Sequence, residues 1–322
     1  MEREMPVAGP GEALLKVERV GLCGTDYHIY SGTQPFLTYP RVMGHEISGT
    51  VASIGEGSAF RIGQLVTVNP YIACGRCRAC RRGKPNCCRN ISVLGVHQDG
   101  AMTEFVCVPE SALVDATGLT PEHAAMVEFL AIGAHAVARA NLSHDDHALV
   151  VGAGPIGVAA ALFAKLDGAR VTLIDTRQAR LDHARNNVGI DDTLLVSDTI
   201  IDDLAAATDG EFFDCVFDAT GNIKAMSAGL EYVAHGGSYV LISVVKDDLT
   251  FPDPEFHKRE TTLLGSRNAT AADFARVIAA IRGGKLPMDQ LHTHSIDIVE
   301  LPLEMPRLIE RADSVLKAIV AV

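Results

Sequence analysis

Five cysteines lie within fifteen residues of one another, at Cys74, Cys77, Cys80, Cys87 and Cys88. Two-residue gaps separate the first three, and seven residues lie between Cys80 and Cys88. A tetrahedral zinc site needs four thiolates on a short folded loop, and C-x2-C pairs supply them two at a time. A disulfide cluster is disfavoured because no signal peptide pattern precedes these cysteines and the remaining ones are scattered. We therefore predict a structural zinc held by Cys74, Cys77, Cys80 and Cys88, with Cys87 as the spare thiol.

A second set of metal-binding side chains comes from three separate segments. Cys23 opens the sequence Cys-Gly-Thr-Asp-Tyr-His, His45 lies in Gly-His-Glu, and Glu128 lies in Ala-Met-Val-Glu-Phe-Leu. Taken singly, they also fit a core thiol, a turn histidine and a charge at a helix start. Glu128 is the most informative, because a carboxylate among apolar residues is costly unless it is paired or bound to a metal. A catalytic zinc takes three protein ligands and keeps one position open, so we predict that these three residues hold a second zinc.

A glycine-rich turn joins an apolar run at residues 148–151 to a helical run at 158–165. Such a turn lets the backbone approach a pyrophosphate and lets the helix pack on the strand. Asp175 ends the next apolar run, 18 residues after the last glycine of the turn, where an acid would bind ribose hydroxyls and repel a 2′-phosphate. The alternative is an ordinary surface aspartate. We predict an NAD site in which Arg180 flanks the adenine side. The residues of the turn are Gly152, Gly154, Pro155, Ile156 and Gly157.

The segments that position these residues predict an α/β protein. Short strands and turns fill the first 120 residues, with strands expected at 13–20, 46–54 and 64–69. A helix is expected to start at Thr120-Pro121, because proline is favoured in the first helical turn. From there helical stretches alternate with apolar runs, which indicates βαβ units and a parallel sheet. The expected elements of this second part are strands at 148–151, 170–174, 213–217 and 237–243, then a helix at 271–283, a strand near 292–296 and a final helix and strand.

Length and composition set limits on the function. The 322 residues suffice for two domains, each with its own core. The formal net charge of −12 argues against a nucleic-acid partner, since phosphate binding needs a basic face. We interpret the cations at residues 76–84 as offsetting the charge of a thiolate-bound zinc. No apolar run approaches the roughly 20 residues that span a bilayer, so we expect no membrane partner and a cytoplasmic protein.

Together these motifs resemble the zinc-containing medium-chain alcohol dehydrogenases, in the branch that acts on polyols, threonine and sugar acids. The likeness covers nearly the whole chain. It implies a GroES-like, mostly β catalytic domain at 1–122 with a zinc lobe at 74–88. It also implies a Rossmann domain with a doubly wound parallel sheet at 123–268, and a C-terminal return to the catalytic domain at 269–322.

The resemblance also implies roles for single residues. Cys23, His45 and Glu128 become the catalytic zinc ligands, and Glu46 an adjacent acid that is either an outer residue or a transient ligand. Two departures stand out. Phe129 occupies a position where the branch usually has proline, and the chain begins at what resembles the second strand of the family, so we expect the first strand to be missing.

The implied activity is the reversible, NAD-dependent oxidation of a secondary hydroxyl of a polyol or sugar acid. The segments at 95–100, 256–261 and 265–270 resemble bacterial enzymes that act on L-galactonate and similar acids, and threonine or another polyol is the alternative substrate. Thr25 and His28 would relay the hydroxyl proton, although a turn-capping threonine and a surface histidine are their ordinary roles. We expect a homodimer or homotetramer.

Two further groups of residues are assigned on the same basis. The nicotinamide end of the cofactor would lie near Val244 and Val245 and against Arg267 and Asn268. A substrate carboxylate would need a cation, supplied by Arg41, Arg267 or Lys258.

Two functions of other classes remain open. A zinc-free quinone or enoyl reductase would share the glycine turn, and a regulatory protein could bind NAD and one zinc without catalysis. The zinc content per chain separates the three alternatives, because the dehydrogenase would hold two zinc ions, the regulator one and the reductase none.

Overall fold

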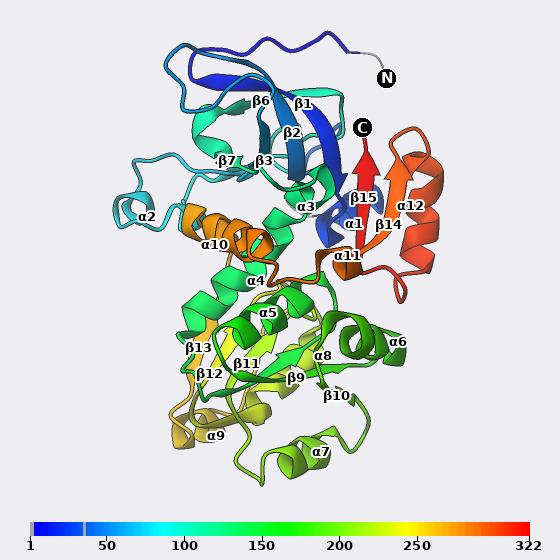
Figure 1. The fold of residues 1–322 in the computed structure, drawn as a ribbon. Helices are drawn as coiled ribbons and strands as arrows, with labels where there is room; N and C mark the ends of the chain where they lie inside the picture. The colour runs from blue at the N-terminus through cyan, green and yellow to red at the C-terminus, as the bar shows by residue number, and fades with distance from the viewer. Residues whose placement is uncertain (1–2, 35–36) are drawn as a thin grey trace. The chain divides into compact units, whose positions relative to one another are not determined.

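The computed structural model describes residues 3–34 and 37–322. The chain divides into two compact units (Figure 1). Unit 1 comprises Met1–Phe129 and Asn268–Val322, and unit 2 comprises Leu130–Arg267. Helix α4 (Val127–Ala140) begins in unit 1 and continues into unit 2.

Unit 1 is built on a seven-stranded mixed sheet with the order β14-β15-β1-β2-β3-β7, in which β6 also pairs with β1. Ala13, Leu15, Val17 and Val20 of strand β1 are buried and pack with residues of β2 in a shared core. Residues 71–72 and 92–93 form a separate two-stranded ribbon of β4 and β5 at the base of the cysteine lobe. The strands of unit 1 are β1 (Glu12–Gly21), β2 (Glu46–Ile54), β3 (Leu65–Val68), β4 (Tyr71–Ile72), β5 (Ser92–Val93), β6 (Phe105–Pro109), β7 (Leu113–Asp115), β14 (His292–Asp297) and β15 (Lys317–Ala321).

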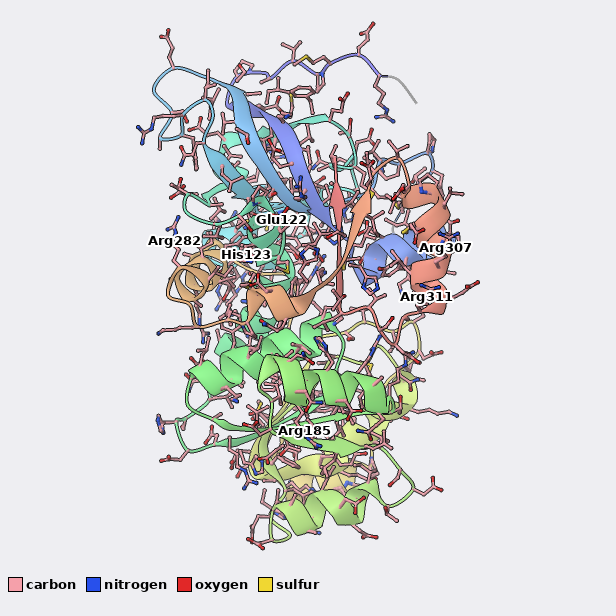
Figure 2. The ribbon with its side chains drawn as sticks, turned by 45° about the vertical axis from the view of Figure 1, so that its right-hand side comes forward. Glu122, His123, Arg185, Arg282, Arg307 and Arg311 are labelled. Atoms are coloured by element: carbon pink, nitrogen blue, oxygen red, sulfur yellow. The ribbon has the colours of Figure 1, made fainter. Side chains whose placement is uncertain are left out.

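The C-terminal segment completes this sheet. Strand β15 pairs antiparallel with β1 and parallel with β14. The guanidinium of Arg282 pairs with Asp115 at 3.1 Å, and the ring of His123 lies 3.2 Å from the Asp289 carboxylate. Arg282 and His123 are labelled in Figure 2. The helices of unit 1 are α1 (Gly24–Tyr30), α2 (Arg78–Arg81), α3 (Pro121–Ala125), α10 (Ala271–Arg282), α11 (Met288–Leu291) and α12 (Leu301–Glu310), with short 3-10 turns at Pro85–Cys87 and Glu110–Ala112.

Unit 2 contains a six-stranded, fully parallel sheet with the order β10-β9-β8-β11-β12-β13. Its first strand therefore lies in the middle and the chain winds outward in both directions, which is the Rossmann arrangement. The strands are β8 (His147–Val151), β9 (Arg170–Asp175), β10 (Asp192–Leu195), β11 (Phe213–Asp218), β12 (Val233–Leu241) and β13 (Thr262–Gly265). The helices are α5 (Pro155–Leu166), α6 (Gln178–His183), α7 (Ile200–Ala207), α8 (Ile223–Ala228) and α9 (Asp253–Lys258), with a π turn at Ala184–Val188 and a 3-10 turn at Gly229–Tyr232.

Three strands of unit 2 differ from the sequence expectation: β10 and β13 are not predicted, and β12 begins earlier than predicted. The apolar pattern predicts a strand at 237–243, whereas β12 begins at Val233 and ends at Leu241. The pairing with β11 shifts register between Phe213 and Cys215, and Gly236 has a φ of 80°. A glycine bulge therefore interrupts the apolar pattern and hides the first part of the strand. Among the described residues no helix is long and apolar enough to cross a membrane.

Candidate metal centres and dinucleotide site

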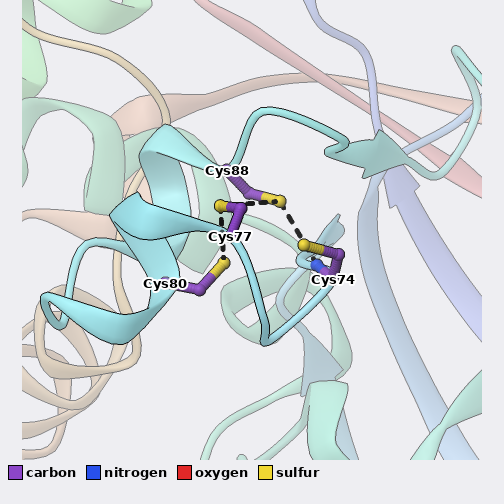
Figure 3. Close-up of side chains that lie close together, drawn as sticks. All are labelled: Cys74, Cys77, Cys80 and Cys88. Atoms are coloured by element: carbon purple, nitrogen blue, oxygen red, sulfur yellow. Dashed lines mark hydrogen bonds between the residues drawn. The ribbon is translucent and has the colours of Figure 1, made fainter.

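The cysteine lobe brings four sulfur atoms around one point (Figure 3). The Sγ atoms of Cys74, Cys77, Cys80 and Cys88 all lie within 4.8 Å of one another. Cys77 Sγ is 3.4 Å from Cys80 Sγ and 4.0 Å from Cys88 Sγ. Zinc–sulfur bonds of about 2.3 Å in a tetrahedron place the sulfurs about 3.8 Å apart, so this cage fits a zinc ion. Cys88 is buried, whereas Cys87 is exposed outside the cluster.

Backbone amides prepare these thiols to ionise. The N–H groups of Cys80 and Arg89 point at Cys77 and lower the pKa of its thiol to about 6. The pKa of the Cys80 thiol moves the other way, to about 12, because the thiol is desolvated and lies beside Cys77 and Cys88. Four crowded thiols cannot all ionise without a cation between them. The pKa shifts of the thiols and the spacing of their sulfur atoms therefore both favour a bound zinc ion.

A second cluster lies at the start of α1 and β2. Cys23 precedes α1, His45 precedes β2, and Glu46 is the first residue of that strand. One ligand atom from each of these three lies within 4.8 Å of the others. Glu128, in the first turn of α4, is outside this set, but its carboxylate and the His45 ring each shift the pKa of the other. The structure thus brings Cys23 and His45 together with two carboxylates.

Three buried polar atoms of this cluster have no hydrogen-bond partner among the described residues: Glu128 Oε2, His45 Nδ1 and Asp26 Oδ1. The other oxygen of Glu128 accepts a hydrogen bond from the Tyr71 hydroxyl. Burial raises the pKa of Glu128 to about 7, and the charge of Glu46 adds to that effect. Buried polar atoms without partners are costly, and a bound cation would satisfy the donors. A thiol, an imidazole and a carboxylate form a set that zinc prefers.

A buried lysine holds Glu46 in place. Lys317 Nζ lies 2.6 and 2.8 Å from the two carboxylate oxygens of Glu46, and it donates to the Leu22 carbonyl at 3.0 Å. It also lies 4.4 Å from the centre of the Phe129 ring, in a cation–π contact. A Cβ at Gly21 would lie 2.2 Å from a carboxylate oxygen of Glu46, so this glycine makes room for the pair. Both oxygens of Glu46 are therefore already bound, unlike Glu128 Oε2.

The proposed relay residues lie on the short helix α1. Thr25 is half-buried and His28 is exposed, three residues later. Residues three apart lie on one face of a helix. The Nδ1 atom of His28 is 3.1 Å from Thr33 Oγ1. Thr25 follows Cys23 by two residues and His28 is exposed at the surface of unit 1, and their role in proton transfer stays a prediction.

The glycine turn of unit 2 has the geometry of a dinucleotide-binding turn. It connects β8 to α5, and Gly152 has a φ of 101°, which favours glycine. A Cβ at Gly157 would lie 1.8 Å from the Gly152 carbonyl oxygen, so only glycine allows α5 to approach the turn this closely. Pro155 and Ile156 lie in the first turn of α5. Proline is favoured there because the N–H groups of the first turn have no acceptor within the helix.

Asp175 is joined to this turn through the backbone. It ends β9 and is buried, with Oδ2 accepting from the Ala153 N–H at 2.7 Å and Oδ1 from the Arg177 N–H at 2.9 Å. Arg180 Nη1 lies 4.0 Å from Asp175 Oδ2 and 3.7 Å from the Cβ position of Gly154. Arg180 therefore lies over the glycine turn itself, next to the acid.

The residues predicted to hold the nicotinamide come from both units of the chain. Val244 follows β12 and is 82% exposed. Arg267 ends unit 2, whereas Asn268 begins the second segment of unit 1 and donates to the Asn86 carbonyl in the zinc lobe at 3.3 Å. Their contact with a cofactor stays a prediction.

Three residues of the metal cluster escaped the sequence reasoning: Asp26, Tyr71 and Lys317. The signal for Lys317 was present, because it is the sole charge in the apolar run at 316–322. Like Glu128 among its apolar neighbours, a charged residue in an apolar strand needs a partner.

Comparison with known proteins decides the family. The alcohol dehydrogenase GroES-like domain matches residues 9–118, and the zinc-binding dehydrogenase domain matches residues 155–283. The chain is 43% identical to the L-galactonate-5-dehydrogenase of Escherichia coli K12 over 294 residues, which cover 91% of this chain and 86% of the relative. The chain belongs to the zinc-containing medium-chain alcohol dehydrogenase family.

Further relatives fit the same family. The L-threonine 3-dehydrogenase of Rhizobium etli CIAT 652 is 32% identical over 91% of this chain and 87% of its own. A solved alcohol dehydrogenase from Escherichia coli CFT073, in complex with NADH, has a TM-score of 0.92 and 29% identity, and the match covers 100% of this chain and 95% of that one. The expected GroES-like and Rossmann architecture, the dehydrogenase class and the zinc and nicotinamide cofactors are therefore confirmed.

Proposed function

We propose that this dehydrogenase uses NAD to oxidise the secondary hydroxyl of an acyclic sugar acid or polyol, with L-galactonate as the first candidate. The observation that supports the chemistry best is the half-buried Cys23 and the buried His45 near the unpartnered oxygen of Glu128. The substrate class is supported by the 43% identity to an L-galactonate-5-dehydrogenase, compared with 32% for the threonine dehydrogenases.

Cys23, His45 and Glu128 are the proposed ligands of the catalytic zinc. Glu46, and not Glu128, has a ligand atom within 4.8 Å of those of Cys23 and His45. However, Lys317 already binds both oxygens of Glu46, which favours Glu128 as the third ligand. A zinc ion in this site would act as a Lewis acid that lowers the pKa of the substrate hydroxyl. Cys74, Cys77, Cys80 and Cys88 would hold a second, structural zinc.

Different residues would transfer the proton of the substrate hydroxyl and bind the cofactor. Thr25 would accept the hydroxyl proton and His28, at the exposed end of α1, would pass it to solvent. Gly152, Gly154 and Gly157 leave the backbone open to the pyrophosphate. Asp175 would bind the adenine ribose and would repel a 2′-phosphate, which favours NAD over NADP.

Arg41 is better placed than Lys258 to bind a substrate carboxylate. It lies in unit 1, four residues before His45, and its buried Nε has no partner among the described residues. The Nη1 atom of Arg41 lies 3.2 Å from the Asp99 carboxylate. Hydrogen bonds from Arg3, from the Val42 N–H group and from Arg41 lower the pKa of Asp99. Lys258, in contrast, is exposed in unit 2 and lies 3.7 Å from Glu255. A guanidinium also suits a carboxylate better, because it can bind both oxygens.

The test is a comparison of kcat/KM with NAD for L-galactonate, sorbitol, L-threonine and ethanol. We expect L-galactonate to be best and ethanol to be poorer by several orders of magnitude, because a site built for polar groups rejects an analogue without them. Arg41→Gln should raise KM for L-galactonate by about tenfold and leave sorbitol nearly unchanged, while Lys258→Gln should change neither. Threonine as the best substrate would overturn the sugar-acid assignment, and ethanol as the best would overturn the polar-substrate assignment altogether.

The enzyme is further proposed to work in the cytoplasm as a homodimer or homotetramer. None of the eight cysteines, all of which the structure describes, forms a disulfide, which is typical of a reducing compartment. The assembly follows from the family resemblance. Light scattering on the purified enzyme would measure its mass, and a monomer at micromolar concentration would overturn the proposed assembly.

A further inference from the structure

The cysteine lobe has an excess of positive charge that its zinc does not explain. Residues 57–98 contain no aspartate or glutamate, in a chain whose formal net charge is −12. Four thiolates and one zinc ion have a formal charge of about −2, so six cations exceed what is needed to balance them. The six cations of the lobe are Arg76, Arg78, Arg81, Arg82, Lys84 and Arg89.

Three of these arginines line one hollow. Its volume is about 420 Å³, which is within the range of small-molecule sites. Among the described residues no acidic side chain lines this hollow or forms an ion pair with its arginines. Like charges that face one space repel each other unless an anion lies between them. The lining residues are Arg76, Cys77, Arg78, Ala79, Arg89 and Asn90, which we call the arginine hollow.

We propose that the arginine hollow binds a small oxyanion with at least two negative charges, and that the bound anion stabilises the zinc lobe. Guanidinium groups bind phosphate and carboxylate oxygens in pairs of hydrogen bonds, and Asn90 adds an amide donor. The link to the metal is short. Cys77 itself lines the hollow, between Arg76 and Arg78 in the chain, and Arg89 directly follows Cys88. An anion that holds these arginines therefore also holds the two segments that carry Cys77 and Cys88.

The experiment titrates inorganic phosphate into the full-length, zinc-loaded enzyme by calorimetry, at constant ionic strength set with sodium chloride. Saturating NADH keeps phosphate out of the glycine turn. We expect one saturable phosphate site per chain. Arg76→Gln, Arg78→Gln and Arg89→Gln should each weaken binding by about tenfold or more. Arg82→Gln and Lys84→Gln change the net charge equally but lie outside the hollow, so they should change the affinity less than about twofold.

Several results would overturn the proposal. No saturable binding would exclude the site, and equal weakening by all five variants would reduce it to a diffuse charge effect. Malonate in place of phosphate tests whether the site also binds carboxylates. Malonate binding that is weakened by Arg78→Gln as much as phosphate binding supports a general oxyanion site. If only a polyglutamate peptide or a duplex oligonucleotide binds, the ligand is a macromolecule and the small-anion proposal is wrong. Zinc content is measured for every variant. If one of the three variants of the hollow loses the lobe zinc, the affinities of the other two still test the proposal.

The stabilising role has its own readout. Phosphate should slow the extraction of the lobe zinc by a chromogenic chelator by several-fold in the wild type, because ligand binding and metal retention are linked. It should have little effect in Arg78→Gln. Phosphate binding without slower extraction would overturn the stabilising role.

Discussion

Replacing Lys317 by methionine would remove one partner of the most deeply buried ion pair in the described chain. The lysine side chain is 1% exposed and that of Glu46 is 0% exposed. Methionine is unbranched like lysine, is shorter by the terminal atom and carries no charge. The substitution leaves a buried carboxylate with no counter-ion, and it leaves the Leu22 carbonyl without its donor.

The expected loss of stability is large. Removing one partner of a buried pair costs about 3–5 kcal/mol, because the other charge stays desolvated. The contact with Phe129 adds about 0.5–2 kcal/mol at most. In a domain of this size each kcal/mol corresponds to about 2–4 °C, so a total of about 3.5–7 kcal/mol should lower the midpoint of thermal unfolding by roughly 7–28 °C. Lys317→Met combined with Glu46→Gln removes both charges and should recover about 2 kcal/mol or more.

The assay is urea unfolding of the zinc-loaded enzyme, followed by far-ultraviolet circular dichroism because the chain has no tryptophan. The two single variants and the double variant together form a double-mutant cycle. A single loss below about 1 kcal/mol, or strictly additive losses, would refute the argument that the pair is buried and coupled. Cobalt in place of the catalytic zinc gives a second signal, since a Glu46 released from Lys317 would alter the absorption spectrum of the metal.

Two further predictions follow from the other parts of the site. Cys77→Ser should cost more than about 4 kcal/mol of stability through loss of the structural zinc, while the folded fraction stays active; Cys87→Ser is the matched control and should retain both zinc ions. A stable Cys77→Ser enzyme that lost only catalysis would contradict the structural role. Asp175→Ser should raise KM for NAD by about tenfold and relax the discrimination against NADP, because it removes the ribose acceptor and its charge. A wild-type preference for NADP in steady-state kinetics would show that Asp175 has another role.

Much of the architecture could be predicted from the sequence because its signals are local. Gly152, Gly157 and Asp175 lie on consecutive elements of one βαβ unit, where spacing along the chain fixes proximity in space. The cysteine lobe is equally local, since its four thiols lie within fifteen residues. The start of β12 could not be predicted, because a glycine bulge breaks the apolar pattern that marks a strand.

The metal cluster shows the limit of such reasoning. Lys317 and Glu46 are 271 positions apart and meet only because β15 returns to pair with β1. Tyr71 and Glu128 are 57 positions apart and come from different elements. Contacts of this kind depend on topology, and residue types alone do not reveal which buried charge will find which partner.

The central claim is that Cys23, His45 and Glu128 hold a catalytic zinc distinct from the zinc of the cysteine lobe. Metal analysis of the wild type and of Glu128→Ala, together with NAD reduction in the presence of L-galactonate and a titration with NADH, tests it most directly. The wild type should contain two zinc ions per chain, and Glu128→Ala should contain one, bind NADH normally and show no turnover. A Glu128→Ala enzyme that retained two zinc ions or full activity would contradict the account.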